Sequence, residues 1–131
     1  MNKYGKRNLG FGLSVVVGVV VTAMLLVPAS DIPGPHIEGL DKVIHFAMFF
    51  LLVLPALTFA PSSWVWVVPL AIFYGGMIEI IQPYFGRGME FGDFVANTLG
   101  VCTAIPISRA IHRRWLEPRQ ISQHKRPERH D

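Results

Sequence analysis

Polar side chains recur at helical spacing inside otherwise apolar stretches of this sequence. Three pairs share that spacing: Asp41 with His45, Glu79 with Gln82, and Asp93 with Asn97. Residues three or four positions apart project from one face of a helix. Because an ionisable side chain inside a membrane span costs about 2.5–3.5 kcal/mol, such residues usually mark a functional site. The spacing therefore predicts three helices that each present a polar pair.

Acid–base chemistry is one use for these residue types. An imidazole beside carboxylates can act as a general base. His45 is then the candidate base, Asp41 or Glu79 orients it, and the remaining carboxylate is the acid. Lys42 and Arg87 are candidate partners for an anion. The sequence has no serine or cysteine beside His45 and no His-rich metal triad, which disfavours a covalent hydrolytic route. We expect no metal and no cofactor.

Most of these residues also have a structural interpretation. Asp41 and Asp93 stand where helix N-caps belong, and aspartate is a favoured cap. Lys42 suits the membrane interface, where its charged end reaches water. Gln82 and Asn97 suit hydrogen bonds between helices. A structural ion-pair network is therefore an open alternative to a site.

Glu79 is harder to explain in this way. It lies about one and a half turns before the expected end of its helix. It needs Arg87, Lys42 or His45 as a partner, or else it stays protonated. We expect electrostatic coupling between Glu79 and Arg87, because Arg87 is the only arginine between the first and last apolar runs.

The elements that must position these residues are long apolar runs. Of the 131 residues, 51% are hydrophobic and 16% are charged, whereas a soluble domain carries about 25% charged residues. A spanning helix needs about 20 mostly apolar residues. Four runs qualify, namely residues 9–27, 43–60, 64–84 and 94–111. The sequence predicts an all-α membrane protein, a bundle of four transmembrane helices. We expect Pro55 and Pro69 to kink their helices rather than break them.

Basic residues gather at the two ends of the chain. Three precede the first apolar run, seven lie at or beyond the end of the last, and only Lys42 and Arg87 lie between. Basic segments stay on the cytoplasmic side, so we expect both termini to be cytoplasmic. The loops 28–42 and 85–93 are then external. They carry the acids Asp31, Glu38, Asp41, Glu90 and Asp93.

This topology places the polar pairs at one depth in the outer half of the membrane. We infer one polar pocket open to the external face. Its expected ligand-binding residues are Asp41, Lys42, His45, Glu79, Gln82, Arg87, Asp93 and Asn97.

Three segments are expected along the chain. Residues 1–8 form a basic cytoplasmic N-terminus, residues 9–112 the four-helix domain, and residues 113–131 a basic, disordered tail near anionic lipids. Run 9–27 is longer than the apolar core of a signal peptide, about 7–15 residues, so we interpret it as a spanning helix. Ala96, Gly100 and Ala104 form a small-residue packing seam. The charge pattern describes membrane topology and does not indicate nucleic-acid binding.

At the polar residues the sequence resembles the VanZ-like family of small bacterial membrane proteins. The resemblance rests on Asp41-Lys42-x-x-His45-x-x-x-Phe49, Glu79-x-x-Gln82, Arg87, and Asp93-x-x-x-Asn97-x-x-Gly100, in that order. It spans about residues 40–104. It implies a multi-pass protein of the bacterial inner membrane. The name-giving member is associated with resistance to the glycopeptide antibiotic teicoplanin, by a mechanism that the resemblance does not supply.

Three functions are consistent with these patterns. The first is binding of an anionic or amide-rich envelope ligand, such as a lipid or a cell-wall precursor. The second is an enzyme that uses His45 with Asp41 or Glu79 on such a molecule. The third is a structural partner subunit, in which the polar residues serve stability alone.

Overall fold

Four long helices make up the structure, a computed structural model that describes residues 2–28, 37 and 39–116. They are α1 (Lys3–Leu25), α2 (Leu40–Phe59), α3 (Trp64–Ile81) and α4 (Phe91–Ile111). Short helical turns follow them at η2 (Pro61–Ser63), η3 (Gln82–Phe85) and η4 (His112–Leu116). All four helices are long and apolar enough to cross a membrane, and the described residues contain no strand. The predicted all-α fold of four spanning helices is confirmed.

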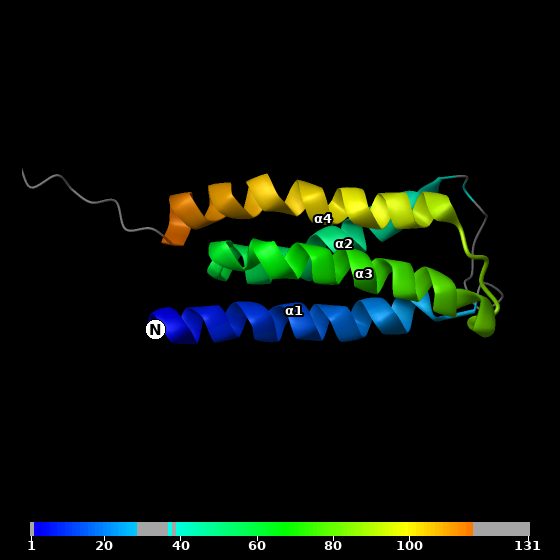
Figure 1. Cartoon of the computed structure of the whole chain (residues 1–131), viewed down its shortest axis with the longest axis horizontal. Helices are drawn as coiled ribbons and strands as arrows, with labels where there is room; N and C mark the ends of the chain where they lie inside the picture. The colour runs from blue at the N-terminus through cyan, green and yellow to red at the C-terminus, as the bar shows by residue number, and fades with distance from the viewer. Residues whose placement is uncertain (1, 29–36, 38, 117–131) are drawn as a thin grey trace, which may run out of the picture.

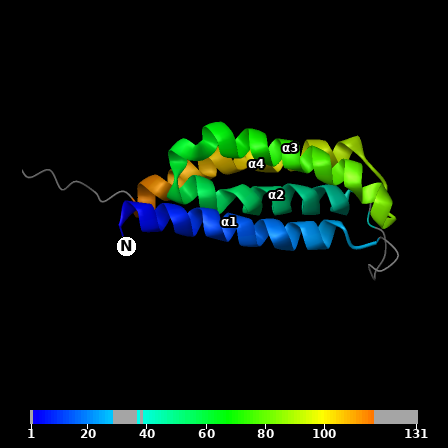
Figure 2. The same cartoon turned by 60° about the horizontal axis from the view of Figure 1, so that its bottom comes forward.

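The start of α1 and the end of α4 lie at the same end of the bundle (Figure 1). The helix α2 lies between α1 and the pair formed by α3 and α4 (Figure 2). The starts of α2 and α4 and the end of α3 therefore meet at the opposite end. Two of our expectations lie outside the described residues. They are the external position of Asp31 and Glu38 and the lipid contacts of the tail from residue 117.

Several helices begin earlier than the apolar runs predicted. The helix α1 begins at Lys3 because the Asn2 side chain caps it, accepting a hydrogen bond from the Gly5 N–H at 2.8 Å. Both α2 and α4 begin with a polar turn, so the start of the apolar run could not predict the start of the helix. Their N-cap residues are Gly39 and Glu90, neither of which makes a side-chain cap hydrogen bond.

The N-cap interpretation of Asp41 and Asp93 is therefore wrong. Asp41 is the second residue of α2 and Asp93 the third residue of α4, so both lie in the first turn of their helices. Anionic side chains are stabilised there by the partial positive charge of the helix N-terminus. Their carboxylates remain available for contacts with other helices.

The small-residue seam lies between α2 and α4, as expected. A Cβ atom built on Gly100 would clash with the Phe46 carbonyl oxygen and would lie 3.0 Å from the Phe50 nitrogen. Ala96 and Ala104, one turn to either side, are buried. The backbones of α2 and α4 therefore touch, which excludes lipid from this interface.

Prolines lie within the helices without ending them. Pro55 lies inside α2 and Pro69 inside α3, and both helices continue for at least one further turn. The Pro55 carbonyl oxygen lies where α1 approaches α2 most closely, because a Cβ on Gly10 would lie 2.9 Å from it. The core between the helices is apolar, with Phe49, Val53 and Leu57 of α2 almost completely buried.

Candidate functional site

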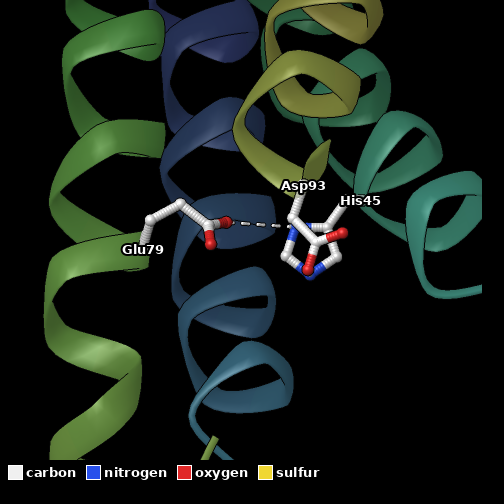
Figure 3. Close-up of side chains that lie close together, drawn as sticks. All are labelled: His45, Glu79 and Asp93. Atoms are coloured by element: carbon white, nitrogen blue, oxygen red, sulfur yellow. Dashed lines mark ion pairs between the residues drawn. The ribbon is translucent and has the colours of Figure 1, made fainter. Parts of the chain in front are cut away.

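Four polar side chains from three helices meet inside the bundle. His45 comes from α2, Glu79 from α3, and Asp93 and Asn97 from α4; we call them the inner cluster. Their exposed fractions are 1%, 4%, 4% and 1% respectively. Figure 3 shows the imidazole beside Asp93, with Glu79 reaching toward it from the facing helix. Burial this complete in a spanning bundle requires that each polar group find a partner in the protein.

The His45 ring contacts a different residue through each nitrogen. Its Nδ1 lies 3.0 Å from Asn97 Oδ1 and 3.6 Å from Glu79 Oε1. Its Nε2 lies 3.7 Å from Asp93 Oδ2. Only the contact with Asn97 is within ordinary hydrogen-bond range, about 2.7–3.2 Å.

Asn97 determines which His45 nitrogen carries the proton. Its Nδ2 donates to Glu79 Oε1 at 3.4 Å, so its Oδ1 is left to accept from the Nδ1–H of His45. With the proton on Nδ1, the neutral ring presents a lone pair at Nε2. Among the described residues, Nε2 has no hydrogen-bond partner, and neither has Asp93 Oδ1.

Glu79 is held by the start of α4 as well as by Asn97. Its Oε2 accepts a hydrogen bond from the Glu90 backbone N–H at 3.4 Å. One turn before Glu79, Gly75 allows α3 to approach α4, because a Cβ there would lie 3.4 Å from the Asn97 Cβ. A small residue therefore brings the carboxylate within reach of its partners.

A second polar group, which we call the rim, surrounds Lys42 at the end of the bundle. Lys42 Nζ lies 3.1 Å from Asp41, 3.0 Å from Glu90 and 3.5 Å from Asp93. The Lys42, Asp41 and Glu90 side chains are 42%, 37% and 55% exposed. The rim is therefore hydrated, and Asp93 is the residue that joins it to the inner cluster.

Three residues expected in the pocket make other contacts. Arg87 Nη1 donates to the Val27 carbonyl oxygen at 3.5 Å, and Gln82 Nε2 donates to the Leu25 carbonyl oxygen at 3.1 Å. Both tie the end of α1 to the segment after α3. Asp41 forms its ion pair with Lys42 and makes none with His45 in the described structure.

Glu79 and Arg87, for which we expected electrostatic coupling, form no direct ion pair within the described chain. Among the described residues, the basic side chain within 4 Å of Glu79 is instead His45, whose Nδ1 lies 3.6 Å from Glu79 Oε1. The physical reason is the turn η3, which continues the chain for four residues beyond α3. It brings Arg87 to the Val27 carbonyl oxygen, just beyond the carboxyl end of α1.

The expected open pocket also differs from the observed arrangement. The inner cluster is closed, and only the rim above it is hydrated. A cavity of about 490 Å³ lies elsewhere, along the apolar faces of α1, α2 and α3. We call this cavity the groove. Its polar contacts include a hydrogen bond between the hydroxyls of Thr22 and Tyr74.

The inner cluster contains a set of possible metal ligands that no sequence motif predicted. One ring nitrogen of His45 and one carboxylate oxygen each of Glu79 and Asp93 lie within 4.8 Å of one another. They come from three helices, so no short spacing links them. Asp41, Glu90 and Asp93 form a second such set, but the ammonium of Lys42 already lies among them.

The four spanning helices and the buried inner cluster define a small multi-pass membrane protein with a polar centre. The model of the VanZ/LLP1 family matches residues 8–112, and the chain belongs to this family. No curated protein and no solved structure matches the chain. The match is longer than the stretch on which the resemblance rested, since it includes nearly all of α1.

Proposed function

We propose that the protein binds the polar head group of an envelope lipid or lipid-linked cell-wall precursor at the rim, from the outer side of a bacterial cytoplasmic membrane. The observation that carries this proposal is the inner cluster beneath a hydrated rim. Polar groups buried in a span are costly and usually functional. Packing alone would be served by apolar side chains.

The charges of the rim narrow the chemistry of the head group. Lys42 is shared by three carboxylates, so it has little capacity for an external anion. Arg87 is half-buried and has a backbone carbonyl as its hydrogen-bond partner. A guanidinium has five N–H donors in a planar fork, so Arg87 is the candidate anion contact. The rim carboxylates suit amide and hydroxyl donors.

The groove supports a ligand that also has an apolar chain. It is lined mostly by apolar side chains, among them Phe11, Val19 and Leu70. Ligand sites combine such apolar surface with a few placed polar groups. An amphiphile would thus place its chain along α1 and α3 and its head group at the rim.

A co-purification experiment tests this proposal. Native mass spectrometry of the full chain, extracted in mild detergent, should show one bound lipid or precursor per protein. Arg87→Gln should remove most of that adduct. Arg109→Gln is the matched control, because Arg109 lies in the last turn of α4, against the Trp64 ring. An adduct that both variants lose equally, or neither loses, argues against head-group binding at the rim.

The proposed topology has its own test. Among described residues, Lys3, Lys6 and Arg7 lie at the same end of the bundle as Arg113 and Arg114. Basic ends of this kind remain in the cytoplasm. Alkaline phosphatase fused after Asp131 should be inactive, and a fluorescent protein there should fluoresce. Phosphatase activity would place the rim on the cytoplasmic side.

Acid–base catalysis is a second candidate, favoured by the free lone pair at His45 Nε2. A neutral imidazole held by Asn97 and facing a carboxylate is arranged as a general base. Mass spectrometry of a lipid-linked precursor incubated with the protein should then show a product. His45→Gln should abolish that product while leaving the fold intact. Altered glycopeptide susceptibility of cells that carry the protein would connect either function to resistance.

A further inference from the structure

The inner cluster has two electron-rich groups facing each other. Nε2 of His45 lies near the Asp93 carboxylate, whose nearer oxygen is 3.7 Å away. Nε2 has no hydrogen-bond partner among the described residues, and Asp93 Oδ1 has only a long contact of 3.5 Å with the Lys42 ammonium. Buried acceptors facing each other repel unless a cation lies between them. The candidates are a proton and a metal ion.

The distances favour a metal ion over a proton. An N–H···O hydrogen bond brings its heavy atoms to about 2.7–3.2 Å, and the separation between His45 Nε2 and Asp93 Oδ2 is 3.7 Å. The contact of Glu79 with His45, at 3.6 Å, is made with the other ring nitrogen, Nδ1. Two ligands that share a tetrahedral ion at about 2.0–2.2 Å are separated by about 3.4 Å. The separation between Nε2 and Asp93 Oδ2 is closer to that value, and one carboxylate oxygen of Glu79 lies within 4.8 Å of a His45 ring nitrogen and an Asp93 oxygen. Small side-chain rotations would bring the ligand atoms onto an ion.

The charge of the cluster favours the same conclusion. Glu79 and Asp93 are two carboxylates at 5% and 6% side-chain exposure. Lys42 contacts Asp93 but is shared with Asp41 and Glu90. No basic side chain other than His45 forms an ion pair with Glu79 within the described part of the chain. A divalent cation would balance both carboxylates without protonating either.

We propose that His45 Nε2, Asp93 and Glu79 bind one divalent transition-metal ion in the outer half of the bundle. Imidazole suits Zn²⁺ and carboxylates also suit Mn²⁺, so a site with one imidazole and two carboxylates selects between these two. Asn97 is the positioning residue, since it accepts the Nδ1–H of His45. Metal-bound histidines usually donate their other N–H in this way.

The proposed ion leaves a fourth position directed toward the rim. Three protein ligands with one open position are typical of catalytic rather than structural zinc sites. An anionic group entering from the rim would complete the coordination, which explains how an acidic end of the bundle would hold an anion. Metal binding itself does not depend on the head-group proposal, and it is measured without any organic ligand.

The test uses the full chain without a histidine tag, treated with a chelator and then given Zn²⁺, Mn²⁺ or Co²⁺ alone. One equivalent of metal should bind. His45→Gln and Asp93→Asn should each weaken the affinity by at least about 100-fold, and Asn97→Ala by about 10–100-fold. The matched control is His124→Gln/His130→Gln, which removes two histidines of the tail and should leave the affinity unchanged.

The wild-type protein provides a readout that does not depend on the folding of variants. Bound Co²⁺ in a four-coordinate site should give strong visible absorption, and added Zn²⁺ should remove it by competition. Absence of this absorption at millimolar Co²⁺ overturns the proposal. So does metal binding that His45→Gln leaves intact or that the tail double variant abolishes. In either case the inner cluster would hold no metal ion, and its four side chains would be a structural polar network.

Discussion

The two sides of α2 are built in different ways. Toward α4, backbones touch at Gly100, and the inner cluster joins the same two helices. Toward α1 and α3, a groove of about 490 Å³ follows the helices, and its polar contacts include the hydroxyl pair of Thr22 and Tyr74. One side excludes lipid and contains charge. The other is apolar and accessible to a chain.

The difference shows why the polar residues lie where they do. A polar group that faces hydrocarbon costs several kcal/mol, so it must lie where another helix, rather than lipid, is its neighbour. Gly100 follows Asn97 by one turn, and Phe46 is adjacent to His45. The close approach of Gly100 to Phe46 therefore determines the distance between Asn97 and His45. The packing seam and the site are one structural unit.

The largest expected effect follows from this unit. Gly100→Ala places a Cβ against the Phe46 carbonyl oxygen, an atom of the backbone that cannot rotate away. Overpacking of this kind costs about 1–3 kcal/mol, occasionally more. We expect a lower free energy of unfolding in detergent and loss of the His45–Asn97 contact. The control is Gly12→Ala, because a Cβ at Gly12 meets nothing within 4 Å. Equal effects of the two substitutions would show that the α2–α4 side is no tighter than the surface of α1.

The sequence predicted the number and type of helices and the seam, because hydrophobic length and small-residue spacing are local signals. It predicted that His45, Glu79 and Asn97 lie at one depth, since pairs at helical spacing mark a face. It could not predict partners. We paired Arg87 with Glu79 on charge alone. The four-residue turn after α3 instead brings Arg87 to the Val27 carbonyl oxygen. The three possible metal ligands lie on three different helices, so no short sequence motif could have predicted them.

A double-mutant cycle separates the observed partner of Glu79 from the expected one. Contacting residues show interaction energies of about 0.5–3 kcal/mol, whereas independent residues add within about 0.3–0.5 kcal/mol. Glu79→Gln combined with His45→Gln should therefore be non-additive in the free energy of unfolding. Glu79→Gln combined with Arg87→Gln should be closer to additive, because no direct contact joins these two side chains in the described structure. The reverse result would show that Arg87 is the interaction partner of Glu79. Arg87 would then compensate part of the negative charge of the inner cluster.

The smallest expected effect lies on the groove side. Thr22→Val removes the hydroxyl that bonds Tyr74 and the Gly18 carbonyl oxygen. Hydrogen bonds between helices in membranes average about 0.6 kcal/mol, with a maximum near 1.7 kcal/mol. We expect a loss in that range, because Tyr74 keeps a long contact of 3.5 Å with Gly18. Thr103→Val is the matched control, since the Thr103 hydroxyl bonds only its own helix, at Leu99, and its side chain is exposed. A loss from Thr22→Val as large as that from Gly100→Ala would mean that α1 is held to α3 as firmly as α2 is to α4. The groove would then be a rigid cavity of the core, and an apolar chain could enter it only by displacing that hydrogen bond.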